Sequence, residues 1–401
     1  MAETFAKGDP TRLNVLVLAT AQILFHCTQS MAIATTPLAA YGMLGTDKTL
    51  ATVPIFLSHL GLMSTTFPAA LLMGRIGRRA GFSIGALIGV AGAIVSFLGI
   101  WWQNFILLCV GGFMQGSSAA FAWHYRFAAT DTASDSFKPK ALSLVMAGGV
   151  IAGLLGPQTA KWSVDLFHPV LFAGVYLMTG LFSLGMLALV QLVQIPTPPK
   201  RTMAETGRPL GEIMRQPVFI TAVTSSMFGY AVMTLVMSAT PLAMLGCGFG
   251  FGDSATVIQA HVIAMFLPSF FTGSLIQKYG HLRIIAAGAI IEMLCAIVNF
   301  MGVAFENFLI ANLFVGLGWN FCYVGGSTLL AQAYKPAEKE KVQGVHDLMV
   351  YSSTALAAGL SGFLQAQAGW TLINAASLPV LAAILVVLFW YKSKTKEVRP
   401  V

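Results

Sequence analysis

Long apolar runs, separated by short polar segments, follow one another along the whole chain. Each run is about as long as the roughly 20 residues that an α-helix needs to cross the hydrocarbon core of a bilayer. The pattern predicts twelve transmembrane helices, at residues 13–37, 51–73, 82–101, 105–128, 141–161, 170–194, 217–242, 255–276, 284–304, 308–332, 345–367 and 371–391. The expected fold class is therefore an all-α membrane protein.

The second half of the chain repeats landmarks of the first half at a nearly constant offset. Three pairs lie 203 residues apart, and a four-residue segment recurs at almost the same distance: Arg12 and Arg215, Gly77 and Gly280, Asn104 and Asn307, and Thr36-Pro37-Leu38-Ala39 with Thr240-Pro241-Leu242-Ala243. A constant offset at separate places indicates a duplicated unit of six helices. We therefore expect two pseudo-symmetric six-helix bundles, residues 1–194 and 217–401, joined by a cytoplasmic linker at 195–216 and ending in a short cytoplasmic tail.

Composition and charge agree with a membrane protein. Hydrophobic residues make up 56% of the chain and charged residues only 9%, which is far from the composition of soluble domains. The net charge of +8 does not point to nucleic acid, because all of the 23 Lys and Arg residues except Lys48 and Lys161 fall in alternate connections and at the two ends. This asymmetry requires an even number of spans with both termini in the cytoplasm. The five cysteines form no Cys-x-x-Cys pair, so we expect no metal site.

Two short basic turns lie between apolar runs in corresponding places of the two halves. The first reads Gly74-Arg75-Ile76-Gly77-Arg78-Arg79, and the second reads Gln277-Lys278-Tyr279-Gly280-His281-Leu282-Arg283. Both resemble the loop between the second and third helices of the major facilitator superfamily (MFS), although Gly74 and Gln277 stand where that family has an acid. The segment Tyr125-Arg126-Phe127-Ala128-Ala129 is similar to bacterial members of the family whose substrates are mostly unassigned.

The resemblance implies a secondary transporter of the bacterial inner membrane. Such proteins rock two bundles around a central site, so that one side closes while the other opens. The sequence contains no phosphate-binding loop, no His-Glu-x-x-His motif and no nucleophile triad. We therefore expect neither an enzyme nor a cofactor.

Ionisable side chains inside the predicted spans are few, and each is a functional candidate because a charge in the bilayer is costly. His26, His59, His261 and Glu292 are the candidates for coupling transport to protons. His59 and His261 occupy nearly equivalent places in the two halves and are candidates for a periplasmic gate pair or a proton relay. Packing within the bundle is the alternative for His26 and the first interpretation for His59, His261 and Glu292.

The predicted solute contacts lie on the first, fourth, seventh and tenth spans, which line the cavity in the resembling family. They are Gln22, His26, Gln29, Gln115, Tyr230, Thr234, Trp319, Asn320 and Tyr323. Gln22, His26 and Gln29 share one helix face because they are four and three residues apart. Amides with aromatic rings suit a small organic solute, and His26 or Arg126 favours anionic character. Interhelical hydrogen bonds are the alternative role.

Charged residues near the cytoplasmic ends of the spans are candidates for a gate. They are Arg75, Arg78, Arg79, Arg126, Asp131, Asp135, Lys278, Arg283 and Asp347. Asp131 and Asp135 can replace the acid that the first turn lacks, and Asp347 is the corresponding choice for Lys278 and Arg283. The alternative to a gate is that these charges only set the orientation of the helices in the membrane, in contact with lipid headgroups.

We therefore predict a monomeric, proton-coupled transporter of a small organic solute, with the lipid bilayer and protons as its other partners and no nucleic acid. Uptake of a vitamin or metal chelate and export of a toxic compound both remain open. A sensor or assembly factor that keeps the fold without transport is the alternative from a different class.

Overall fold

The computed structural model describes residues 10–134, 137–196 and 207–397, and within them it is built from helices. The first half contains α1 (Thr11–Met43), α2 (Val53–Ile76), α3 (Arg78–Trp101), α4 (Phe105–Ala122), α5 (Tyr125–Ala128), α6 (Lys138–Ser163) and α7 (Ala173–Val190). The second half contains α8 (Leu210–Met214), α9 (Pro217–Gly246), α10 (Phe251–Phe266), α11 (Ser269–Tyr279), α12 (His281–Met301), α13 (Phe305–Leu330), the 3₁₀ turn η1 (Pro336–Glu338) and α14 (Lys339–Glu397).

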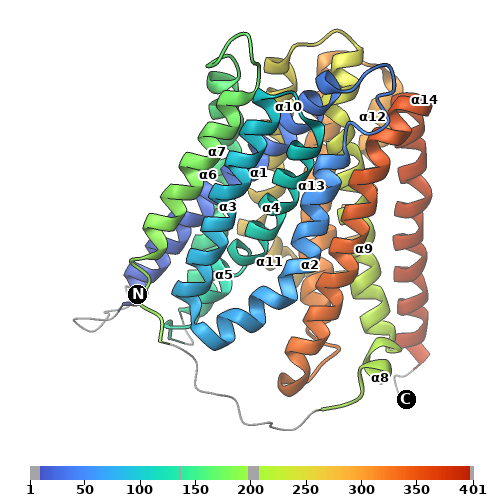
Figure 1. Cartoon of the computed structure of the whole chain (residues 1–401). Helices are drawn as coiled ribbons and strands as arrows, with labels where there is room; N and C mark the ends of the chain where they lie inside the picture. The colour runs from blue at the N-terminus through green and yellow to red at the C-terminus, as the bar shows by residue number, and fades with distance from the viewer. Residues whose placement is uncertain (1–9, 135–136, 197–206, 398–401) are drawn as a thin grey trace.

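Every predicted span coincides with one of these helices or with a pair of them. In the described part of the chain, ten helices are long and apolar enough to cross a bilayer, and an eleventh span results if α10 and α11 count as one. α14 also contains a break at Gly369, whose φ of 73° is left-handed. Figure 1 shows the two limbs of α14 running in opposite directions, side by side. The all-α membrane fold is confirmed, and the count of twelve stays a prediction.

The break between α10 and α11 has an identifiable cause. Pro268 lies between the two helices, which are bent by 43°, and proline lacks the N–H that a continuous helix needs. Asn320 of α13 fills the gap. Its Nδ2 donates to the Met265 carbonyl and to the Ser269 hydroxyl, both at 2.7 Å, and its Oδ1 accepts from the Thr272 hydroxyl at 2.7 Å. The bend is thus held by a side chain of the neighbouring helix.

Glycines bring the backbones of α2 and α4 into direct contact. A Cβ at Gly116 would overlap the Ser58 carbonyl, and a Cβ at Gly61 would overlap the Phe113 carbonyl. Small residues at a helix interface allow such close approach, which is how helices associate where lipid removes the hydrophobic drive between them. α2 and α4 therefore pack without side chains between them along this stretch.

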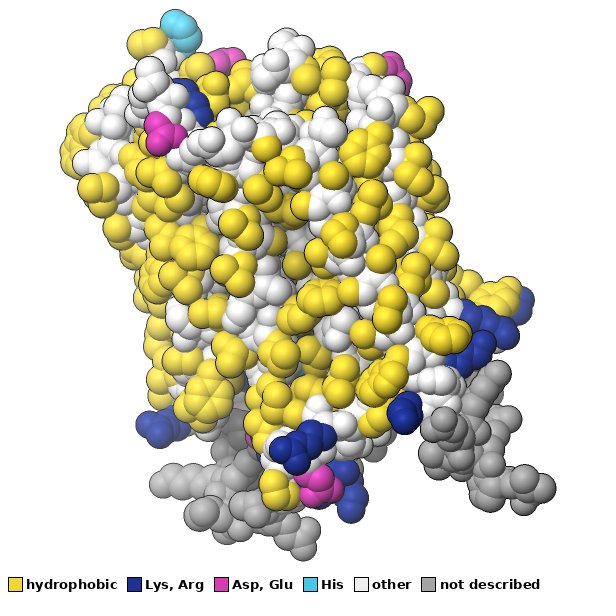
Figure 2. Space-filling model, turned by 90° about the vertical axis from the view of Figure 1, so that its right-hand side faces the viewer, with side chains coloured by type: hydrophobic (Ala, Val, Ile, Leu, Met, Phe, Trp, Pro, Cys, Tyr) yellow, Lys and Arg dark blue, Asp and Glu magenta, His cyan; other side chains and the backbone are white. Residues whose placement is uncertain are grey.

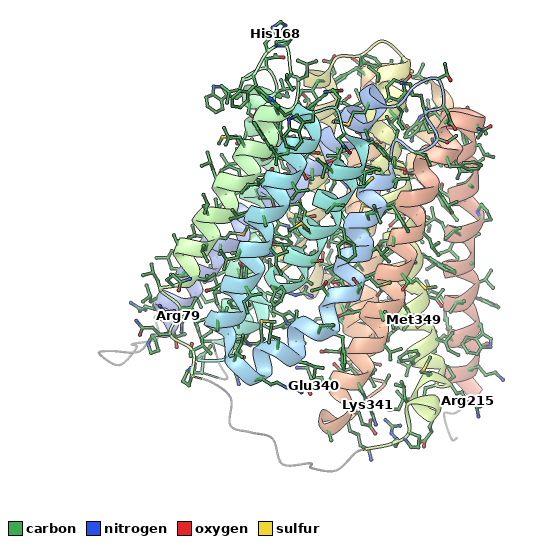
Figure 3. All side chains as sticks on the ribbon, in the orientation of Figure 1. Arg79, His168, Arg215, Glu340, Lys341 and Met349 are labelled. Carbon is green, nitrogen blue, oxygen red and sulfur yellow. The ribbon has the colours of Figure 1, made fainter. Side chains whose placement is uncertain are left out.

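The two ends of the bundle differ in charge. Arg79, Arg215, Glu340 and Lys341 lie at the end where α1 begins and α14 finishes, whereas His168 lies at the other end (Figures 1 and 3). We call these the basic end and the opposite end. Figure 2 shows apolar side chains over the height of one face, with Lys and Arg gathered at its lower edge. Lys7, Lys200, Arg201 and Arg399, which contribute to the predicted charge asymmetry, lie outside the described residues.

Candidate functional site

Aromatic rings from both halves meet at the centre of the bundle, around His26 of α1. The imidazole lies 4.9 Å from the Phe25 ring and 5.5 Å from Trp123, both in the first half, and 4.6 Å from Phe266 of the second half. His26 is only 4% exposed. It therefore lies where the two halves touch, as its predicted place in a central site requires.

The rings continue into the second half. Phe266 is 6.1 Å from Trp319, which stacks on Tyr323 with centroids 5.2 Å apart and an interplanar angle of 9°. Tyr230 meets both rings edge-on at 5.3 Å. We call His26, Trp123, Tyr230, Phe266, Trp319 and Tyr323 the aromatic cluster; its members come from α1, the α4–α5 junction, α9, α10 and α13. Four of the nine residues predicted to contact a solute are in it.

Several buried polar atoms near these rings have no hydrogen-bond partner. As placed, the Gln22 amide donates to His26 Nε2 at 2.7 Å, which leaves Gln22 Oε1 buried and unpaired. Trp319 Nε1 and Thr234 Oγ1 are also buried without a partner. A buried polar group without a partner is costly, so these atoms are suited to bond a solute that reaches the centre.

Arg126 of α5 borders the aromatic cluster. Its guanidinium lies 5.4 Å from the Trp123 ring and 4.7 Å from the Phe127 ring, distances at which a cation is attracted to a π face. Its Nε is buried and has no hydrogen-bond partner. Arg126 thus packs against rings of the first half at the border of the aromatic cluster.

Three other residues that were predicted to contact a solute are not part of the aromatic cluster. Gln115 donates to the Gly89 carbonyl of α3 at 2.9 Å, so its amide joins two helices of the first half. The Asn320 amide holds the α10–α11 bend. Gln29 is half-buried on α1, just past His26. The roles of these three residues in solute contact stay predictions.

The remaining coupling candidates each lie within one half. His59 Nδ1 donates to the Ile55 carbonyl of its own helix at 3.0 Å, and His261 Nδ1 donates to the Asn312 carbonyl at 2.9 Å. Glu292 is 1% exposed, and neither carboxyl oxygen has a hydrogen-bond partner. In the described part of the chain the two histidines are not hydrogen-bonded to each other, so their predicted pairing gains no support.

The gate candidates divide into several groups. Arg78 Nε donates to Asp131 at 2.9 Å, so this aspartate does supply an acid to the first basic turn. Asp135 lies outside the described residues. Arg75 and Arg79 are exposed, and Arg79 reaches Gln191 at 3.4 Å.

In the described structure, the second basic turn does not pair with Asp347, the acid that the sequence analysis assigned to Lys278 and Arg283. Asp347 accepts a hydrogen bond from His346 Nδ1 at 2.9 Å. Lys278 lies over the Tyr279 ring at 5.1 Å. In the part of the chain that the structure describes, neither Lys278 nor Arg283 forms an ion pair. The reason is that Asp347 opens the limb of α14 that faces the first half.

Contacts between the halves concentrate toward the opposite end. The Gly362 N–H donates to Thr52 Oγ1 at 3.0 Å, and the Gln158 amide donates to Gln259 at 2.8 Å. Phe172 and Phe251 meet edge-on at 5.6 Å. A hollow of about 510 Å³ lies outside these contacts, between the loop that follows α1, the end of α9 and the part of α14 just before its break at Gly369. The second hollow, of about 420 Å³, lies at the first basic turn.

Comparison with known proteins identifies the fold family. The Major Facilitator Superfamily sequence profile matches residues 18–308 and 255–401. The chain belongs to the Major Facilitator Superfamily. It is a multi-pass membrane transporter of small molecules and not an enzyme, as predicted.

Individual relatives cover nearly all of the chain. The riboflavin transporter RfnT of Brucella anthropi is 39% identical over 94% of both chains. YddS of Bacillus subtilis, an uncharacterised MFS-type transporter, is 26% identical over 90% of this chain and 86% of its own. Among solved structures, a mutant of the nucleoside transporter NupG has a TM-score of 0.68 at 16% identity, covering 95% of this chain and 99% of its own. An auto-inhibited POT family peptide transporter has the same score at 12% identity, over 97% and 98%.

Sequence reasoning missed Trp123 and Phe266, two rings in contact with His26. Trp123 lies eight residues, about two helical turns, after Gln115, the predicted solute contact on the fourth span, so helical spacing alone could have indicated it. Phe266 belongs to the eighth span, which the resemblance does not place at the cavity. Its position depends on the bend at Pro268, which no periodicity predicts.

Proposed function

We propose that this protein imports riboflavin, or a solute of the same planar and amphipathic kind, across the bacterial inner membrane. Residues 1–194 and 217–401 form two units joined by the linker at 195–216, with both termini in the cytoplasm. The units rock about the central site by alternating access. The protein works as a monomer coupled to protons.

The observation that carries this proposal is the aromatic cluster with its unpaired polar atoms. A flat isoalloxazine ring can stack between aromatic side chains, and its ring carbonyls and sugar-chain hydroxyls can bond groups such as Trp319 Nε1 and Gln22 Oε1. Within the cluster, the ring contact between His26 and Phe266 crosses the boundary between the halves. RfnT, which is 39% identical to this chain, is named for riboflavin.

The contacts between the halves suggest which stage of transport the structure represents. Hydrogen bonds and rings join the halves toward the opposite end, which the charge asymmetry assigns to the periplasm. In this arrangement solute leaves toward the basic, cytoplasmic end. The rings that fill the centre have to move apart when solute is bound, and Phe266, beside the bend at Pro268, is the one that contacts His26 from the second half.

His26 is our candidate for proton coupling. It contacts rings of both halves, so a change of its charge acts on the boundary that transport rearranges. Among the described residues, no ring contact or hydrogen bond joins the side chains of Glu292, His59 or His261 to the other half. A protonated imidazole needs a partner in this apolar place, and the free Gln22 oxygen can supply one after the amide turns over.

The experiment is riboflavin uptake in a bacterial strain that can neither make nor import the vitamin. The wild-type chain should restore growth on low external riboflavin, and Trp319→Ala should lower initial uptake about tenfold or more because a buried aromatic contact is lost. Trp162→Ala is the matched control, because Trp162 is 69% exposed near the opposite end. Equal uptake by both variants, or no uptake by the wild type at confirmed expression, would refute the proposal.

Purified protein provides an independent check. A ligand present at 100 times its dissociation constant should add about 2.7 kcal/mol to the free energy of unfolding. Riboflavin should therefore raise the melting temperature of the wild type and of Trp162→Ala, but not that of Trp319→Ala at the same concentration. A nucleoside or a peptide that produces the larger shift would point to a different substrate.

A further inference from the structure

Phe266 of α10 lies between two of the predicted solute contacts, one from each half. Its ring centroid is 4.6 Å from that of His26 and 6.1 Å from that of Trp319. All three side chains are at most 5% exposed, so this ring fills the space between the other two. A solute that is to touch both His26 and Trp319 therefore needs the place that Phe266 occupies.

A glycine of the first half makes room for this ring. A Cβ at Gly149 of α6 would lie 2.5 to 2.8 Å from three ring carbons of Phe266, closer than real side chains approach one another. Only glycine at this position allows the ring to lie so near to α6. Phe266 is thus seated against α1 and α6 of the first half and against α13 of the second.

Two properties distinguish Phe266 from the other rings of the aromatic cluster. It is the last residue of α10, just before the break at Pro268, whereas the rings of α1, α9 and α13 lie within long helices. Trp123 also lies at a helix end, but its ring contacts in the described structure are with the first half. In addition, Phe266 has no polar atom to bond the buried, unpaired Trp319 Nε1. It fills the place of a solute ring without supplying a solute's hydrogen bonds.

The backbone beside Phe266 is prepared for a change of direction. Asn320 Nδ2 donates to the Met265 carbonyl before the break and to the Ser269 hydroxyl after it. A side chain of a neighbouring helix thus satisfies groups that a continuous helix would satisfy itself. A movement at this bend therefore breaks fewer main-chain hydrogen bonds than a movement in the middle of α10 would.

We propose that Phe266 is a displaceable plug of the solute site. Without solute, its ring takes the place of a solute ring between His26 and Trp319, and a solute binds when the ring swings out at the bend before Pro268. This inference rests on the proposed function, which places a riboflavin-like solute among these rings. Part of the binding free energy is then used to unseat the ring, so the wild-type affinity is lower than the emptied site would give.

The test measures the affinity of the purified, lipid-reconstituted protein for riboflavin by quenching of flavin fluorescence. Phe266→Ala removes the plug and should raise the affinity about tenfold, since the solute no longer displaces two aromatic contacts. A ring that only stacks on the solute gives the opposite sign, and Trp319→Ala should lower the affinity for that reason. The sign of the change therefore separates a plug from an ordinary solute contact.

A second variant expels the ring without deleting it. Gly149→Ala should also raise the affinity, because the added Cβ and the Phe266 ring cannot share the seat. Combined with Phe266→Ala it should raise the affinity no further than Phe266→Ala alone, since both changes act on one contact. The matched control is Gly148→Ala, the preceding residue of α6, where the atoms nearest to a Cβ belong to Ile23 and Ala19 of α1. This control should leave the affinity unchanged.

The outcomes separate the two proposals. If riboflavin binds the wild type but Phe266→Ala lowers the affinity or leaves it unchanged, the plug proposal is wrong and the proposed function stands. An equal rise in Gly148→Ala means that altered packing of α6, and not release of this ring, sets the affinity, and also overturns the plug. If neither the wild type nor the variants bind riboflavin while remaining folded by their melting curves, the proposed function fails and the plug proposal fails with it.

Discussion

His26 and Glu292 are both ionisable, both buried and both inside membrane-spanning helices, yet their surroundings differ. His26 is ringed by aromatic side chains of both halves and is bonded to Gln22. Glu292 lies within the second half, against Gly229 and Gly318, and neither carboxyl oxygen has a partner. An ionised carboxylate in such a place is prohibitively costly, so the neutral acid fits it best.

The contrast shows that burial in the membrane is not enough to indicate a transport role. A group can sense the movement of the halves only if its neighbours change when they move. His26 meets that condition and Glu292 does not. The single acid deep in a span, which sequence reasoning singles out for its charge, is therefore the weaker candidate for coupling.

The largest expected effect is on riboflavin accumulation, and it comes from replacing His26 and Glu292 in turn. His26→Ala should abolish accumulation of riboflavin against a gradient, by at least about tenfold, while exchange of labelled for unlabelled solute continues, because coupling is lost and binding is not. Glu292→Gln, which keeps shape and neutrality, should leave both unchanged. Uptake and counterflow in reconstituted vesicles measure the two quantities.

That comparison has a clear way to fail. If Glu292→Gln abolishes accumulation and His26→Ala retains it, the coupling group lies within one half and our assignment is reversed. If both variants accumulate solute normally, neither residue is coupled to transport.

An intermediate effect, on stability, is expected from replacing Gly318, the glycine that makes room for Glu292. A Cβ at Gly318 would lie 2.5 Å from Glu292 Cγ and 2.7 Å from the Gly288 carbonyl. Gly318→Ala should therefore lower the free energy of unfolding by about 1 to 3 kcal/mol. Adding Glu292→Ala should restore part of the loss but not all, since the Gly288 backbone remains in place.

The control for this prediction is Gly344→Ala in α14, where an added Cβ meets nothing within 4 Å. That variant should be neutral or slightly stabilising, because alanine favours the helix. Melting of the purified variants in the same detergent measures all three. An unchanged melting temperature for Gly318→Ala would contradict the tight packing around Glu292.

The smallest effect concerns a second buried acid, Glu338, which differs from Glu292 in having hydrogen-bond partners. Arg208 donates to both of its oxygens at 2.9 and 2.8 Å, and the Lys335 N–H donates at 2.9 Å. These bonds hold the pKa of the Glu338 carboxyl well below its usual range. Because the native pKa is the lower one, the stability gained is complete above the unfolded pKa of about 4.3 and is lost as the pH falls below it.

Glu338→Gln should therefore lower the melting temperature at pH 7 slightly, and the difference from the wild type should shrink as the pH falls from about 5 toward 3. Glu292→Gln should show the opposite trend. A carboxyl that is neutral in the fold but ionised in the unfolded chain destabilises the wild type above the unfolded pKa of about 4.3, so the wild type should gain stability relative to this variant as the pH falls. If the difference in melting temperature between the wild type and Glu338→Gln does not change with pH, Glu338 is not stabilised as a carboxylate.

Much of the fold could be predicted from the sequence because crossing a bilayer requires long apolar helices. All the predicted spans coincide with helices, and Gly77 and Gly280 do form left-handed turns with φ of 87° and 83°. The basic turn acquired Asp131 as its acid, as expected. Proline positions were visible as well, but the direction of the bend at Pro268 depends on Asn320, whose role only the packed structure reveals.

The site could be predicted only in part. His26, Tyr230, Trp319 and Tyr323 lie on helix faces that periodicity exposes, and they do meet. The sequence did not indicate that Gln115 bonds to α3, or that Asp347 bonds to His346 and not to Lys278. Those outcomes depend on how the helices are rotated and on how the halves face each other, and neither is encoded in the spacing of residues along one helix.

The carbonyls of Ser58 and Phe113 lie so close to Gly116 and Gly61 that α2 and α4 cannot slide past each other without parting. They must travel as one rigid lever. Thr52, at the start of α2, accepts a hydrogen bond from the Gly362 N–H of α14, so this contact with the second half is attached to the same rigid pair of helices.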